Sequence, residues 1–168
     1  MNGREAAESI FLAGVRSVLP GSLMSNVMSL KDQTLSIGGH EIHLGNIENI
    51  YVIGAGKASA AMGHYVETIL GNRIKGGHIV VKYGHSCKLK RIEVTEAGHP
   101  VPDGNGFRAT NEIIRIATEA SANDLVICLI SGGGSALMAD LPDGLLPEEL
   151  YIVNNLLVRC GAAINEIN

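Results

Sequence analysis

Residues 125–136 read LVICLISGGGSA, and this stretch decides the fold class of the chain. An unbroken apolar run, introduced by Asn123 and Asp124, predicts a strand that is buried on both faces, as in the parallel sheets of α/β proteins. The glycines follow at the carboxyl end of this strand, which is where open α/β sheets bind ligands. We therefore expect the turn at 131–135 to present backbone N–H groups and hydroxyls to an anion. A tight turn without a ligand is the alternative.

Strand and helix signals alternate on both sides of the turn. Because such alternation implies right-handed βαβ crossovers, we expect an α/β fold, a Rossmann-like three-layer α/β/α sandwich with a mostly parallel sheet. A small N-terminal helix and hairpin precede it, and residues 1–168 are expected to form a single domain. Strands are predicted at 50–53, 77–83, 91–98 and 125–130, a hairpin at 33–44, and helices at 3–19, up to Leu70, from about Asn105, from Ser135 and at 147–160.

Composition excludes several classes of function. The net charge of −4 gives no basic footprint for nucleic acid. No apolar run reaches the roughly 18 residues of a membrane span, so no membrane partner is expected. Cys87, Cys128 and Cys160 are odd in number and lack CxxC spacing, which argues against disulfides or zinc and indicates a reducing, cytoplasmic setting.

A second strand, glycine turn and helix unit spans residues 49–71. Its turn contains Gly54 and Gly56, and Lys57 begins the helix, where a cation opposes the macrodipole. A bound anion would reverse that sign, so Lys57 is predicted to neutralise a phosphate or carboxylate at the helix N-terminus. A merely solvated lysine is the alternative.

This turn does not match the two familiar nucleotide fingerprints. A dinucleotide GxGxxG would need glycine at Ser59 and an acid at the end of the next strand, where Lys82 stands. A Walker A loop would need glycine at Tyr51 and a hydroxyl residue at Ala58. NAD is therefore disfavoured, and the turn is a glycine-lysine turn of another kind.

The stretch GHPVPDGNG at 98–106 is too rigid and too polar for a spare linker. Pro100 and Pro102 restrict the backbone around His99 and Asp103, so both side chains can be held still. The alternative for Asp103 is a turn or a cap at the start of the next helix.

Five blocks of this sequence together resemble the N-terminal domain of the type II glycerate kinases, a family formerly named hydroxypyruvate reductase. The likeness covers residues 4–168, and the blocks are VIGAGKASAAM (52–62), VVKYGH (80–85), EAGHPVPD (96–103), LISGGGSALM (129–138) and GAAINEIN (161–168). The resemblance implies a cleft between two domains in which ATP phosphorylates the 2-hydroxyl of D-glycerate to give 2-phosphoglycerate. It also places Lys57 and the SGGGS block at the active site.

Phosphoryl transfer requires mainly positioning and cations around the phosphate oxygens. Lys57 is predicted to bridge donor phosphate and acceptor carboxylate, while Asp103 or Glu166 ligates Mg²⁺ or accepts the hydroxyl proton, and His99 positions the acceptor. The predicted site has catalytic Lys57 and Asp103, and substrate- or phosphate-binding Gly54, Gly56, His99, Ser131, Gly132, Gly133, Gly134, Ser135, Glu166 and Asn168.

In one respect the chain departs from that family. The resemblance implies a basic segment after the EIN block and a C-terminal domain with an essential arginine, and neither follows Asn168. We therefore expect the N-terminal half of a site, with ATP, Mg²⁺, D-glycerate and the missing C-terminal domain as its partners. Whether the chain forms a homo-oligomer stays open. The alternatives are an NAD(P)-dependent hydroxypyruvate reductase and a non-catalytic phosphate- or sugar-phosphate-binding module.

Overall fold

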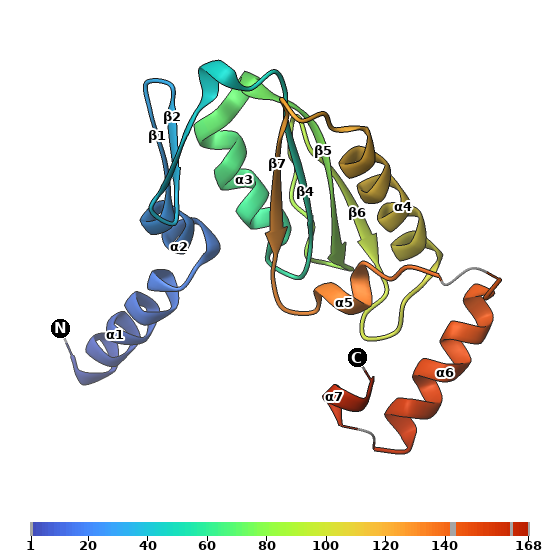
Figure 1. Ribbon diagram of the computed structural model, residues 1–168. Coiled ribbons are helices and arrows are strands. Elements are labelled where there is room, and N and C mark those ends of the chain that lie inside the picture. The colour runs from blue at the N-terminus through green and yellow to red at the C-terminus, as the bar shows by residue number, and fades with distance from the viewer. Residues whose placement is uncertain (1, 142–143, 162, 168) are drawn as a thin grey trace.

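A central parallel sheet with helices on both faces organises the molecule (Figure 1). The computed structural model describes residues 2–141, 144–161 and 163–167. The sheet has four parallel strands in the order β6-β5-β4-β7. They are β4 (Ile50–Ala55), β5 (Ile74–Lys82), β6 (Glu93–Ala97) and β7 (Leu125–Ile130). The predicted Rossmann-like α/β sandwich is confirmed, and every strand pair of this sheet is parallel.

Each face of the sheet is covered by one long helix. Helix α3 (Ser59–Leu70) packs on one face through Ala60 and Val66, and the 3-10 helix η2 (Gly71–Arg73) follows it. Helix α4 (Gly104–Glu119) packs on the other face through Ala109, Ile113 and Ile116. The two hydrophobic clusters therefore lie on opposite sides of the strands, as the three-layer prediction requires.

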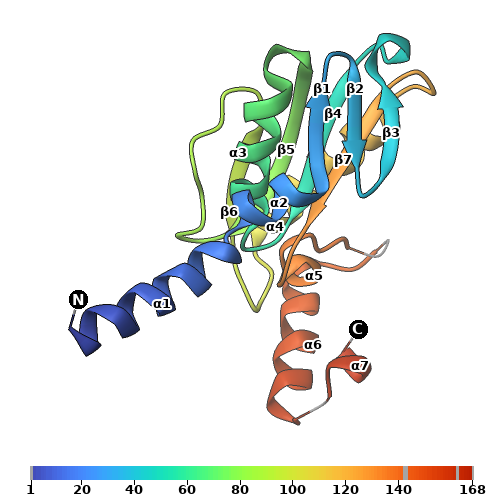
Figure 2. The same ribbon diagram turned by 90° about the vertical axis from the view of Figure 1, so that its left-hand side faces the viewer.

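The N-terminal region forms a second, smaller sheet against α3. Its antiparallel strands are β1 (Met28–Lys31), β2 (Thr34–Ile37) and β3 (His40–His43), followed by the 3-10 helix η1 (Leu44–Asn46). Gly38 and Gly39 make the predicted hairpin turn with positive φ, whereas β1 was not predicted. Figure 2 shows this sheet beside α3, where the Tyr65 hydroxyl donates to the Met28 carbonyl at 2.9 Å.

The first helix differs from its prediction in end point and in packing. Helix α1 (Gly3–Ser17) has a capping box between Asn2 and Glu5 but no buried residue. Pro20 starts a second helix, α2 (Pro20–Val27), instead of only ending the first, since proline fits the first helical position. No single described helix is long and apolar enough to cross a membrane, while α1 and α2 together pass that test as a pair bent by 52°.

Strand β7 is not buried on both faces, and that prediction was wrong. Ile127 and Leu129 are buried on the α3 side, but Cys128 is exposed and Ile130 is 53% exposed. The reason is topological: β7 is an edge strand, and α4 covers the other end of the sheet, over β5 and β6. An apolar run alone does not distinguish such an edge from a central strand.

Three helices follow β7 in the part of the chain that the structure describes. They are α5 (Gly134–Leu137), α6 (Pro147–Arg159) and α7 (Ile164–Ile167). Leu137 of α5 is fully buried in the α4-side cluster. In contrast, α6 extends away from the sheet in Figures 1 and 2 and exposes Tyr151, Ile152 and Leu156.

One buried polar side chain makes stability depend on pH. His78 of β5 is 6% exposed, and its Nε2 lies 2.9 Å from the Thr95 hydroxyl. Its Nδ1 has no hydrogen-bond partner among the described residues. Burial lowers the pKa of His78 below its ordinary value, and the charges of Glu93 and Glu112 only partly oppose this effect. The imidazole is therefore held neutral in the folded chain.

We predict that the free energy of unfolding falls as the pH drops below about 6.5, the ordinary pKa of histidine. The unfolded chain binds the proton more readily than folded His78, so the stabilisation is complete above that pH and is lost toward the lower folded pKa. The loss is at most about 1.4 kcal/mol per pH unit between the two pKa values. Urea unfolding at pH 8 and pH 5 measures it. His78→Gln should reduce the pH dependence and His64→Gln, on the exposed side of α3, should not; equal slopes in the two variants would contradict the prediction.

Candidate functional site

Three loops meet at the carboxyl edge of the parallel sheet. They are the turn at 56–58 after β4, the loop at 98–103 after β6 and the turn at 131–133 after β7. Parallel strands place their carboxyl ends at one edge, so loops far apart in the sequence become neighbours. These loops carry most of the residues that the sequence analysis selected.

Ser131 joins the two glycine turns. Its N–H donates to the Ala55 carbonyl at 3.1 Å, and its hydroxyl accepts the Ala58 N–H at 2.9 Å. In return, the Lys57 N–H donates to the Gly132 carbonyl at 3.2 Å. Ala58, the N-cap position of α3, offers no side-chain cap of its own. The Ser131 hydroxyl therefore caps α3 from the neighbouring strand's turn, a structural role that its sequence position did not reveal.

Gly54 and Gly56 are explained by the close approach of β4 and β7. A Cβ on Gly54 would lie 2.4 Å from the Leu129 carbonyl oxygen. A Cβ on Gly56, whose φ is +134°, would lie 2.2 Å from the Ser131 Oγ. Both distances are far inside van der Waals contact, so only glycine fits. Direct contact of these glycines with a ligand stays a prediction.

Lys57 and His99 converge on Gly133. A Cβ on Gly133, whose φ is +88°, would lie 2.6 Å from the His99 Nε2 and 3.5 Å from the Lys57 Cε. The His99 ring is half-buried while Lys57 is exposed. Burial, followed by the charges of Lys57 and Lys82, lowers the pKa of His99 below its ordinary value. The site thus combines a lysine ammonium, a neutral imidazole and a glycine turn.

The free N–H groups of the turn are fewer than predicted. Gly134 donates its N–H to the Ser131 carbonyl at 3.2 Å, so that group is already bonded. The N–H groups of Gly132 and Gly133 make no hydrogen bond to any described residue. Ser135 is exposed on α5. An anion beside Lys57 would therefore meet Gly132 and Gly133 first.

Asp103 is the N-cap of α4, the alternative that the sequence left open. Its Oδ1 accepts the N–H groups of Asn105 at 3.1 Å and Gly106 at 3.0 Å, and its Oδ2 accepts the Tyr83 hydroxyl at 2.8 Å. Burial alone would raise the pKa of Asp103, but these bonds, with one from the Gly98 N–H, outweigh burial and lower it. The ionised carboxylate fixes the loop that carries His99, and a catalytic role for Asp103 stays a prediction.

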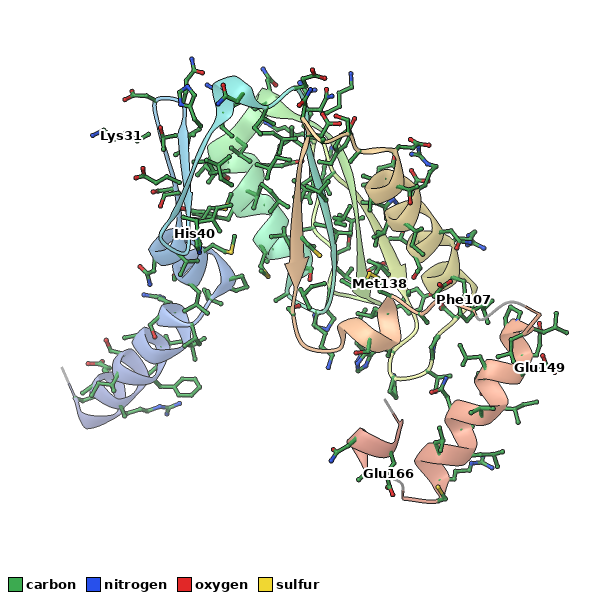
Figure 3. All side chains as sticks on the ribbon, in the orientation of Figure 1. Lys31, His40, Phe107, Met138, Glu149 and Glu166 are labelled. Carbon is green, nitrogen blue, oxygen red and sulfur yellow. The ribbon has the colours of Figure 1, made fainter. Side chains whose placement is uncertain are left out.

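The described residues do not bring three possible metal ligands together. No three His, Cys, Asp or Glu side chains among them lie close enough to hold a metal ion. Glu166 caps its own short helix, accepting the Ala163 N–H at 2.7 Å, and Figure 3 shows it away from the ends of the strands. Asn168 lies outside the described residues.

Lys82 and Tyr83 are site residues that the sequence analysis missed. Lys82 is the last residue of β5, at the same edge as Lys57, and Tyr83 holds Asp103. The available signal was positional: residues that end neighbouring parallel strands lie together.

We predict that Gly56→Ala destabilises the chain by about 2–4 kcal/mol, because a Cβ there combines backbone strain with a clash against Ser131. Chemical denaturation of the purified chain measures the loss. Gly76→Ala is the matched control, since a Cβ on Gly76 in β5 meets nothing within 4 Å and needs no positive φ. Equal losses in the two variants would show that the two turns are not in close contact.

Comparisons with known proteins identify relatives of this chain. The model of a family described as a domain of unknown function, DUF4147, matches residues 6–168. A glycerate 2-kinase of Pyrococcus horikoshii is 36% identical over 168 residues, which cover all of this chain and 37% of that protein. A putative hydroxypyruvate reductase of Agrobacterium vitis is 43% identical over 117 residues, 70% of this chain and 30% of that protein.

Two solved structures have the same fold. A Pyrococcus horikoshii protein superposes with a TM-score of 0.86 at 36% identity, covering 99% of this chain and 37% of its own. A glycerate kinase of Thermotoga maritima superposes with a TM-score of 0.76 at 30% identity, covering 97% and 36%. The chain thus spans little more than a third of the length of these relatives. It belongs to the DUF4147 family, and the resemblance to glycerate kinases is confirmed.

Proposed function

We propose that this chain supplies the N-terminal half of a glycerate kinase site, in which ATP phosphorylates the 2-hydroxyl of D-glycerate to 2-phosphoglycerate. The observation that carries the proposal is the convergence of Lys57 and His99 on Gly133, beside the free N–H groups of Gly132 and Gly133. This arrangement suits a phosphate, because N–H groups and an ammonium bind its oxygens from two sides. The names of the relatives point to the same substrate.

In the proposed reaction the chain positions the phosphate and neutralises its charge. The Lys57 ammonium and the two N–H groups stabilise the equatorial oxygens while the 2-hydroxyl oxygen bonds to phosphorus and the bond to the leaving nucleoside diphosphate breaks. His99 is held neutral, so its unprotonated nitrogen can accept the hydroxyl proton. This assignment favours His99 over Asp103, whose oxygens already accept the Tyr83 hydroxyl and the N–H groups of Asn105 and Gly106.

Phosphoryl transfer needs further cations around the phosphate oxygens. We propose that a second part of the enzyme, outside this chain, supplies them. No three possible metal ligands lie together among the described residues, but Mg²⁺ commonly binds through substrate phosphates and water with few protein ligands. The exposed apolar side chains of α6 and of the α4 side of β7 support an interface with a C-terminal domain. The three free cysteines support a reducing, cytoplasmic setting.

We predict that Lys57→Met lowers kcat for ATP-dependent formation of 2-phosphoglycerate by at least ~10²-fold, as expected for loss of a transition-state cation. The variant is made in a longer protein that contains this chain and the proposed C-terminal domain. A coupled assay for 2-phosphoglycerate measures the rate. Lys31→Met, in β1 and away from the strand ends that carry the site (Figure 3), is the control and should keep full activity. Near-normal kcat in Lys57→Met would remove Lys57 from the mechanism.

Further assays test the two alternatives, a hydroxypyruvate reductase and a non-catalytic phosphate-binding module. The reductase alternative has the name of the Agrobacterium vitis relative in its favour, but Ser59 and Lys82 occupy the two positions that NAD would need as glycine and acid. NADH oxidation with hydroxypyruvate, without ATP-dependent phosphorylation, would support it. Ligand stabilisation of this chain without turnover in the longer protein would support the module, with about 2.7 kcal/mol expected at a hundredfold excess over Kd.

A further inference from the structure

Lys82 stands at the carboxyl edge of the sheet on the α4 side. It ends β5 and pairs with Ala97, the last residue of β6. Side chains alternate along a strand, so Lys82 shares a face with Val80, which packs against Ala55, Ala97 and Leu137. The side chain is half-buried. It therefore emerges beside the loop that begins directly after Ala97 and carries His99.

Lys82 is one of several basic residues near His99. Lys57, Lys82 and His85 all contribute to lowering the pKa of His99, after burial. Among the described residues, no carboxylate lies within 4 Å of either lysine ammonium.

The nearest acids are bonded to other groups. The Glu96 carboxylate accepts the Gly84 N–H at 2.7 Å, and the Asp103 carboxylate is bound to Tyr83 and to the start of α4. Since neither lysine is ion-paired with a described carboxylate, both ammonium groups can attract a bound anion.

The two lysines have different neighbours. Lys57 lies beside the free N–H groups of Gly132 and Gly133, which suit the several oxygens of a phosphate. The three N–H groups that follow Lys82 are already bonded: Tyr83 donates to Ala97, Gly84 to Glu96 and His85 to Lys82. Lys82 therefore offers a single ammonium without a backbone cradle, which suits the two oxygens of a carboxylate.

We propose that Lys82 binds the carboxylate of a phosphorylated hydroxy acid whose phosphate lies at Lys57 and the Gly132–Gly133 turn. The proposal rests on the proposed function and deepens it, because it assigns the acceptor's carboxylate to one side chain. It also fixes the orientation of the ligand, with the phosphate toward β7 and the carboxylate toward β5.

Three ligands distinguish the contributions of the phosphate and the carboxylate to binding. 2-Phosphoglycerate carries both groups, glycerol 2-phosphate carries only the phosphate, and D-glycerate carries only the carboxylate. Calorimetric titration of the purified chain with each ligand gives Kd. We expect Lys82→Gln to weaken 2-phosphoglycerate about tenfold, as for loss of a partly buried ion pair, and to leave glycerol 2-phosphate within about twofold. Lys57→Gln should weaken both phosphorylated ligands. Lys75→Gln, near the opposite end of β5, should change neither.

Equal weakening of both phosphorylated ligands by Lys82→Gln would make Lys82 a phosphate ligand and overturn the proposal, as would no change with either. Failure of the unmodified chain to bind 2-phosphoglycerate at millimolar concentration would overturn it too. A second readout needs no ligand: the pKa of His99, followed by NMR, should rise in Lys82→Gln and not in Lys75→Gln. The kinase assay is independent, so selective carboxylate binding without phosphorylation would reject the proposed function while sustaining the role of Lys82.

Discussion

The contact between Ser131 and the turn after β4 organises the carboxyl edge of the sheet. One residue donates to Ala55, caps α3 through Ala58 and leaves no room for a side chain at Gly56. A cap of this kind contributes about 0.5–2 kcal/mol, but its larger effect is geometric. Because hydrogen bonds join the two turns, the backbone of Lys57 is held next to the turn that carries the free N–H groups of Gly132 and Gly133.

The loop after β6 is held at the same edge of the sheet by a different set of hydrogen bonds. Asp103 caps α4 and accepts the Tyr83 hydroxyl, and Asn105 donates to that same hydroxyl at 2.9 Å. Tyr83 in turn follows Lys82 at the end of β5. The loop that carries His99 is therefore anchored to both β5 and α4. A binding edge built from three loops acquires rigidity in this way without burying the polar groups that must meet a ligand.

The fold could be predicted from sequence because its signals are local. Apolar runs, glycine turns and helix stops identified the four parallel strands and the helices between them, and the hairpin at Gly38 and Gly39. The exposed face of β7 could not be predicted, since an edge strand and a central strand carry the same apolar run. The site residues likewise differ in whether the sequence predicts them. Lys57, His99 and the glycine turn follow from local patterns, whereas Lys82 is recognised only once β5 lies beside β4 and β6. Asp103 had two interpretations, and the N-cap bonds that distinguish them depend on where α4 begins.

The electrostatics of this edge favour an anion without requiring a charged histidine. If His99 were protonated, its charge would add to those of Lys57 and Lys82, and burial together with these lysines makes that state unfavourable. The neutral ring instead keeps a nitrogen able to accept a proton while the two lysines supply the charge. Asp103 stays ionised because its hydrogen bonds stabilise the carboxylate, and those same bonds occupy it within the protein. Asp103 thus helps to fix the loop that carries the His99 imidazole. The attraction for an incoming anion comes from the ammonium groups of Lys57 and Lys82.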